Sequence, residues 1–233
     1  MKIAFIVDSF PNASETFIVR QMHGLMKAGH QIYIFAGSAA DKSVLDVLNV
    51  DNKLLVRVRI FNQKPSNPFV RIILALLLAP LFLLRAPLAM LNSLNIFKYG
   101  AEAGSLNYYF QAFAFSSVRV NAVIAHFGPN GLVGARMKEI GALPRKLICF
   151  FHAYDLTSYV ARMGEKVYLP LFRQCSFAVA ISNRGRENLI GLGCPLAKVT
   201  LMHIGVDVNE YDAVFRTIDP LKPLRILSVA RLV

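Results

Sequence analysis

Histidine and acidic side chains stand near the ends of several short apolar runs in this sequence. His126, His152 and His203 each lie at or next to such an end, and Asp155 follows His152 by three residues. An imidazole can donate or accept a hydrogen bond near neutral pH and can take part in group transfer. Two interpretations of His152 stay open: a strand-end histidine that is hydrogen-bonded locally, or a group that contacts a sugar hydroxyl.

A polar loop, PNASET, follows the first apolar run and precedes a helical pattern. One interpretation is structural: Asn12 or Ser14 caps the helix, and Glu15 and Thr16 occupy its first turn, where an acidic side chain favours the helix dipole. The other is functional: Glu15 accepts a hydrogen bond from a sugar hydroxyl, while free backbone N–H groups at the helix start face an anionic group.

The spacing of these residues disfavours several other kinds of site. The glycines of GPNGLVG, which surround Asn130, do not form the G-x-G-x-x-G pattern of a dinucleotide-binding loop. No G-x-S-x-G elbow of a hydrolase is present in the sequence. A metal site is disfavoured too, because the histidines lie on separate strand ends without short-spaced ligand pairs.

The elements that must position these residues are short apolar runs alternating with helical patterns. Such runs are typical of parallel strands covered on both faces, so we predict an α/β fold with a doubly wound parallel sheet. Polar residues at five successive strand ends then predict a cleft at the carboxyl edge of the sheet. The predicted strands are 2–7, 31–36, 53–61, 121–127, 146–152, 176–182 and 198–204. The predicted helices are one with Ile18, Met22, Leu25 and Met26 on a common face and Gly29 after it, then 67–98, 103–119, 131–140 and one followed by Gly191 and Gly193.

Basic and apolar residues are concentrated together in one segment. The chain has 26 Lys+Arg against 14 Asp+Glu, and 55% of its residues are hydrophobic. Residues 52–101 contain no acidic side chain, and their apolar run 72–84 is shorter than the about 20 residues of a spanning helix and contains Pro80. We interpret 53–98 either as buried core helices or as a surface that lies on an anionic membrane. Nucleic acid is disfavoured because the basic residues alternate with Leu and Ile rather than with stacking aromatics.

The cysteines and the first residues indicate the cellular setting. Cys149 and Cys175 lie in or beside apolar runs, as buried thiols do, and Cys194 adds no paired metal spacing. Asp8 interrupts the opening apolar run, so we do not interpret it as a signal peptide. We expect a cytoplasmic protein.

Taken together, SETF, AHFGPNG, FHAYD, AISNRGRENLIGLGCP, VTLMHIGVD and RILSVARLV resemble the amino-terminal half of family 4 glycosyltransferases, above all bacterial enzymes of exopolysaccharide and colanic-acid-type synthesis. The resemblance covers essentially the whole chain. It implies the GT-B fold, in which two Rossmann-like domains face a cleft, and a retaining sugar transfer with no obligatory metal or other cofactor. It also implies that 1–205 form the acceptor-side domain, 206–223 a linker and 224–233 the first strand of a donor-binding domain that is otherwise missing.

The resemblance also implies roles for individual residues. His152 matches the histidine near the reacting donor sugar, and Asp155 would support its loop. Ser14, Glu15 and Thr16, with His126, Asn130 and Asp155, would line the acceptor side. Arg231 matches the arginine that helps hold the donor diphosphate, although Ala230 stands where the family usually has glycine.

The partners implied are a sugar nucleotide and a glycan or lipid-linked acceptor at the inner membrane face, where the protein would be peripheral. Without a donor half we expect this chain alone to be poorly active, since one wall of a cleft cannot position two substrates. The alternative is a non-catalytic membrane-surface binding module derived from such an enzyme.

Overall fold

The computed structural model describes residues 1–12, 14–39, 52–144 and 146–206, together with 208, 223 and 226–228. Arg231, most of the predicted linker and most of the predicted strand 224–233 lie outside the described residues.

Seven strands form one sheet in the order β3-β2-β1-β4-β5-β6-β7, and every pairing within it is parallel. The predicted doubly wound parallel sheet is therefore confirmed. Strand β1 lies inside the sheet and pairs Phe5 with Ile34 of β2 on one side and with Ile124 of β4 on the other. The strands are β1 Lys2–Phe10, β2 Gln31–Ala39, β3 Val58–Ile60, β4 Ala122–His126, β5 Leu147–Phe151, β6 Phe177–Ala180 and β7 Val199–Leu201.

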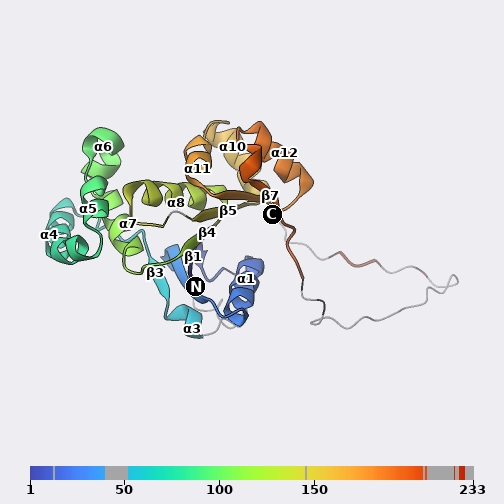
Figure 1. Cartoon of the computed structure of the whole chain (residues 1–233), viewed down its shortest axis with the longest axis horizontal. Helices are drawn as coiled ribbons and strands as arrows, with labels where there is room; N and C mark the ends of the chain where they lie inside the picture. The colour runs from blue at the N-terminus through green and yellow to red at the C-terminus, as the bar shows by residue number, and fades with distance from the viewer. Residues whose placement is uncertain are drawn as a thin grey trace.

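Helices cover both faces of this sheet (Figure 1). On one face, α1 buries Ile18, Val19 and Met22 in a core that includes Phe5 and Ile34. On the other face, a second core joins Ile6 and Cys149 of the strands to residues of α7, α8, α11 and α12. The helices are α1 Thr16–Lys27, α3 Asn52–Leu55, α4 Pro68–Arg85, α5 Pro87–Ser93, α6 Ile96–Gly104, α7 Asn107–Phe115, α8 Gly128–Ile140, α9 Ala153–Leu156, α10 Ser158–Met163, α11 Leu169–Gln174 and α12 Asn183–Gly191. A short 3₁₀ helix spans Leu196–Lys198.

The predicted strand 53–61 is wrong in its first half, where the chain forms the helical turn α3 before β3 begins. The adjacent residues Leu54 and Leu55 both pack into the core beside α1. Successive residues of a strand point to opposite faces, so a helical turn is needed to turn both inward.

The predicted helices at 67–98 and 103–119 are four shorter helices, α4 to α7. Pro87 begins α5, because the extended Ala86 before it, with φ −154°, ends α4. Pro80 lies inside α4 without ending it. The helix predicted at 131–140 begins earlier, at Gly128.

Helices α4, α5 and α6 form an extension that gathers beyond α7, away from the strands (Figure 1). Within the described ranges, α4 is the one helix whose length and apolar content would suffice to cross a membrane, and 11% of it is buried. Its buried residues are Ala75 and Phe82, whereas Leu77 is 71% exposed and Leu84 is 83% exposed. The interpretation of this segment as buried core helices is therefore wrong for most of α4.

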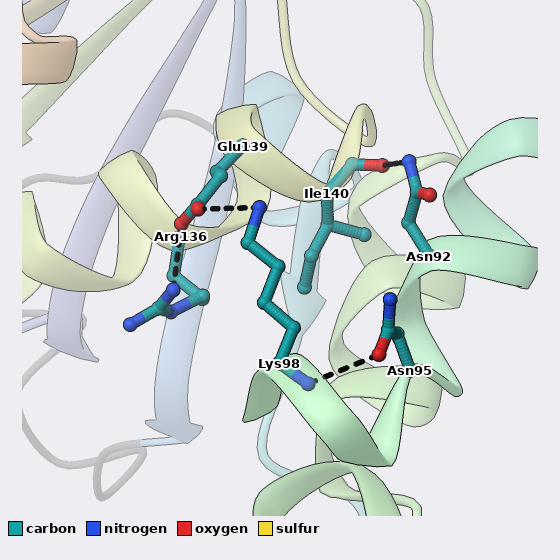
Figure 2. Close-up of polar contacts among 6 residues, drawn as sticks. All are labelled: Asn92, Asn95, Lys98, Arg136, Glu139 and Ile140. Carbon is teal, nitrogen blue, oxygen red and sulfur yellow. Dashed lines mark hydrogen bonds and ion pairs between the residues drawn. The ribbon is translucent and has the colours of Figure 1, made fainter. Parts of the chain in front are cut away.

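The extension is fixed to the C-terminal part of α8 (Figure 2). Lys98 of α6 pairs with Glu139 at 2.8 Å, and Arg136 pairs with the same carboxylate at 2.6 Å. Asn92 of α5 donates to the backbone oxygen of Ile140 at 3.0 Å. Asn95 caps α6 by accepting from the backbone N–H of Lys98.

Arg71 holds the base of the extension. Its guanidinium donates to three backbone oxygens, those of Pro65, Ser66 and Ser105. The side chain therefore links the start of α4 to the residue that follows α6.

Candidate functional site

Two buried histidines meet at the carboxyl edge of the sheet. His126 is the last residue of β4 and His152 directly follows β5, and their side chains approach to 3.4 Å between His126 Nδ1 and His152 Nε2. They are 2% and 8% exposed. Adjacent parallel strands end at the same edge, and this brings together two residues that are far apart in the sequence.

Phenylalanine rings enclose the two imidazoles. His126 stacks between Phe5 and Phe150 at centroid distances of 5.9 and 5.0 Å. Phe17 and Phe127 lie 4.9 and 4.4 Å from the His152 ring. Phe127 adopts the unusual φ of 70° between β4 and α8, a conformation that costs on the order of 1–3 kcal/mol and occurs often at functional sites.

Burial among these rings keeps both histidines neutral. Burial, with a smaller contribution from the neighbouring His152, lowers the pKa of His126 to about 3. Burial alone lowers the pKa of His152 to about 4. Near pH 7 each ring therefore has one N–H donor and one nitrogen acceptor, which suits hydrogen bonding to hydroxyls rather than charge pairing.

Gln21 of α1 extends this pair. Its Oε1 atom lies 2.8 Å from His126 Nε2. Sequence reasoning missed Gln21, although a signal existed: it stands one helical turn after Phe17, so the two share a face that looks toward the strand ends.

Asp155 holds the backbone of two loops together from a fully buried position. Its Oδ2 atom accepts from the backbone N–H of His152 at 3.0 Å and of Gly128 at 2.9 Å. Its other oxygen has no hydrogen-bond partner. Burial raises the pKa of Asp155 to about 6, and the two backbone donors oppose that rise. In the structure this carboxyl supports the loops rather than facing a ligand.

Tyr168, which sequence reasoning also missed, fixes the same junction. Its hydroxyl donates to the backbone oxygen of Asp155 at 3.0 Å. A Cβ atom at Gly128 would lie 2.4 Å from the Tyr168 ring. The glycine is therefore required for the close approach of α8 to Tyr168. This contact fixes the position of the junction between β4 and α8.

The loop before α1 does not cap the helix through a side chain. Glu15 occupies the N-cap position without a capping hydrogen bond. Asn12 Oδ1 accepts from the backbone and hydroxyl of Ser14, and its amide donates to Glu15 at 3.2 Å. Burial, with Asp8 nearby, raises the pKa of Glu15 to about 7. The capping interpretation is thus not supported, and Glu15 is a carboxyl that can accept or donate near neutral pH.

Pockets surround His152. One of about 270 Å³ is lined by Arg20, Gln21, His126, His152 and His203, among others. Another of about 300 Å³ lies on the other side of His152, against Ser182 and Arg184. Ser14, Glu15, Phe17 and Phe127 line an open hollow next to the first. His152 is therefore the side chain that both pockets share.

The remaining predicted site residues do not line these pockets or lie outside the described residues. Asn130 is 6% exposed and donates to the backbone oxygen of His126 at 2.8 Å, so it supports β4 rather than facing a pocket. Thr16 is exposed at the start of α1. Arg231 lies outside the described residues. Across the described part of the chain, no group of three or more His, Cys, Asp or Glu side chains is placed to hold a metal ion.

The sequence of this chain matches a family of known proteins. The model of the family described as Glycosyltransferase Family 4 matches residues 14–210. WcaL of Salmonella typhimurium, named for colanic acid biosynthesis, is 30% identical over the whole of this chain. AmsK of Erwinia amylovora, named as an amylovoran biosynthesis glycosyltransferase, is 29% identical. The chain spans 57% of the length of each of these relatives.

Solved structures share the fold. HepE of Anabaena, crystallised with UDP-glucose, superposes with a TM-score of 0.55 at 18% identity over 91% of this chain and 46% of its own. The lipopolysaccharide outer core galactosyltransferase WaaB, in its apo form, gives a TM-score of 0.52 at 14% identity over 89% of this chain and 47% of its own. At these identities the likeness concerns the fold.

Proposed function

Because this chain belongs to glycosyltransferase family 4, we propose that it forms the acceptor-side part of an enzyme that transfers a sugar from a sugar nucleotide to a glycan or lipid-linked acceptor. The reaction serves cell-surface polysaccharide synthesis and retains the anomeric configuration. Residues 1–205 are the acceptor-side domain. A donor-binding domain, to which Arg231 belongs, completes the cleft.

The single observation that carries this proposal is the neutral imidazole of His152 at the point where two pockets meet. A sugar presents many hydroxyls and little charge, so a neutral N–H donor in an aromatic enclosure suits it. Glu15, ionising near neutral pH in the adjacent hollow, is the candidate acceptor for an incoming hydroxyl. The relatives named for polysaccharide biosynthesis and the neighbour crystallised with UDP-glucose support the substrate classes.

The test is transfer of label from UDP-glucose, and in parallel from other UDP- and GDP-sugars, to a lipid extract of polysaccharide-producing cells, with a donor-binding half supplied to this chain. We expect His152→Ala to lower transfer roughly 100-fold or more, the range of a lost acid–base or hydrogen-bonding group. His30→Ala, whose side chain lies next to the N-terminus, is the matched control. The proton spectrum of the product reports retention. Unchanged transfer in His152→Ala would contradict the role given to this residue.

We also propose that the α4–α6 extension rests on an anionic membrane, so that the enzyme is peripheral at the cytoplasmic face. The extension contains no acidic residue before Glu102. It exposes large apolar side chains, including Leu76, Leu77, Leu88 and Phe97, which is 98% exposed. So many exposed apolar side chains within one segment favour contact with a membrane, and the basic Arg85 at the end of α4 favours anionic headgroups.

Flotation with vesicles of neutral lipid, and of neutral lipid with an anionic lipid, tests this surface. We expect Leu77→Asp to reduce recovery with vesicles at least 10-fold, because a buried leucine contributes about 1.5–3 kcal/mol. Val56→Asp, at a residue that is 74% exposed outside the extension, is the control. Arg85→Glu should weaken the preference for anionic vesicles. Arg71 is unsuitable for this test, since its guanidinium is committed to backbone oxygens.

A non-catalytic membrane module is the second candidate function, and the exposed apolar side of α4 is the observation that favours it. The two functions differ in the first assay: a module would bind vesicles but transfer no sugar in any form of the protein.

A further inference from the structure

We propose that Gln21 is a positioning residue for His152 and that it acts through His126: the first helix sets which nitrogen of His126 carries the proton, and thereby whether His126 accepts a hydrogen bond from His152. The functional meaning of this inference rests on the proposed function, whereas the hydrogen-bonded geometry from which it is argued does not.

The first step is the contact between Gln21 and His126. Gln21 presents its carbonyl oxygen to His126 Nε2 at 2.8 Å, and a carbonyl oxygen can only accept. His126 Nε2 therefore carries the proton. Since the ring is neutral, its Nδ1 atom is an acceptor.

The second step passes this constraint to His152. The acceptor Nδ1 of His126 faces His152 Nε2 at 3.4 Å, so His152 donates from Nε2. The same tautomer of His152 is supported locally, because its side chain accepts from the backbone N–H of Asp155 in the capping box at the start of α9. For His126 the other ring contacts are with Phe5, Phe17 and Phe150, which have no group that could select a tautomer. Gln21 is thus the side chain at the outer end of the chain of hydrogen bonds.

The third step concerns the ligand. At 3.4 Å the bond between the two rings is long, so an oxygen that enters the pocket lined by Gln21, His126 and His152 can replace it. Such bonds often become short only when substrate is bound. With Gln21 in place, His152 offers an N–H to a sugar oxygen instead of a bare nitrogen.

Nitrogen-15 NMR of histidine-labelled protein tests the assignment directly. We expect the Nε2–H tautomer for both His126 and His152 in the wild-type chain. In Gln21→Met the His126 signals should move toward a tautomer mixture, whereas those of His152, which the backbone N–H of Asp155 also holds, should move less. Gln31→Met, at an exposed glutamine that begins β2, should leave both unchanged. His126→Gln and His152→Gln assign the signals, and the amide spectrum reports folding.

Gln21→Glu supplies a second, independent readout. The carboxylate still accepts from Nε2, but it favours a charged His126, whose Nδ1 would then donate toward His152. The charged or titratable groups around the pair are Arg20 and His203 in the pocket wall and Asp155 beneath His152. A neighbouring carboxylate raises the pKa of an imidazole, but the pKa of His126 starts at about 3. We therefore expect kcat of Gln21→Glu to fall roughly 10-fold between pH 7 and pH 5 relative to wild type, with KM little changed.

Identical tautomers in wild type and Gln21→Met, or His152 protonated on Nδ1 in the wild type, would overturn the inference whether or not sugar is transferred. If the wild-type protein showed the expected tautomers but transferred no sugar, that result would instead refute the proposed function.

Discussion

Removal of the buried carboxyl at Asp155 should loosen the whole candidate site. In Asp155→Ala the backbone N–H groups of His152 and Gly128 lose their acceptor. A buried donor without a partner costs about 1–3 kcal/mol, so two of them cost roughly 2–6 kcal/mol. Because domains of this kind are stable by about 5–15 kcal/mol, the variant should be strongly destabilised.

The pH dependence separates the charge of Asp155 from its hydrogen bonds. Burial raises its pKa from 3.8 to about 6, so ionising it disfavours the folded state. This cost is absent below pH 3.8, grows as the pH rises and is complete above pH 6, where it is on the order of 3 kcal/mol. Asp155→Asn keeps an oxygen acceptor without the charge. Its stability relative to wild type should therefore increase from pH 4 to pH 7.

Urea unfolding followed by circular dichroism at pH 4, 5.5 and 7 measures both effects. We expect the midpoint of Asp155→Ala to fall by about 1 M or more at pH 4, where the ionisation cost in the wild type is nearly absent, given a typical urea dependence of about 1–3 kcal/mol per molar. The reasoning would be refuted by an alanine variant within about 1 kcal/mol of wild type at pH 4. A constant difference between Asp155→Asn and wild type from pH 4 to pH 7 would refute the charge argument alone.

Further predictions concern three other positions. Gly128→Ala should destabilise the protein by about 1–3 kcal/mol in urea unfolding, because its Cβ would meet the Tyr168 ring; Gly24→Ala, with open space around it, should not. Glu15→Gln should raise the melting temperature relative to wild type at pH 8 but not at pH 4, because burial raises the pKa of Glu15 to about 7 and its ionisation disfavours the folded state. Arg71→Ala should increase amide hydrogen exchange at the start of α4 while leaving the sheet protected, since three backbone oxygens lose their donor.

Much of this fold could be predicted from the order of apolar runs. All seven predicted strands exist, and their common direction explains why His126 and His152 end at one edge. Spacing alone could not predict α3, because K-L-L-V-R-V-R-I fits a strand pattern until the packing of Leu54 and Leu55 is known. The break at Ala86 could have been predicted, because Pro87 follows it. The break at Leu94 could not, since it depends on how the extension packs against α8.

Only part of the candidate site could be predicted from the sequence. Asp155 was expected to support the loop of His152, and the structure shows the two hydrogen bonds through which it does so. Asn130 was expected to line the cleft, but its amide is directed to its own strand end. Gln21 and Tyr168 escaped notice because their partners are far away in sequence, and only the fold brings them close.

One helix connects the two surfaces to which functions are proposed. At one end, Gly128 and Asn130 of α8 support the histidine pair; at the other end, Arg136, Glu139 and Ile140 anchor the extension (Figure 2). A 13-residue helix is about 20 Å long. It therefore acts as a spacer of set length: a membrane that held the extension would also set the height of the histidines above the lipid. The size of the acceptor headgroup, rather than its sugar chemistry alone, would then decide which molecules reach the site.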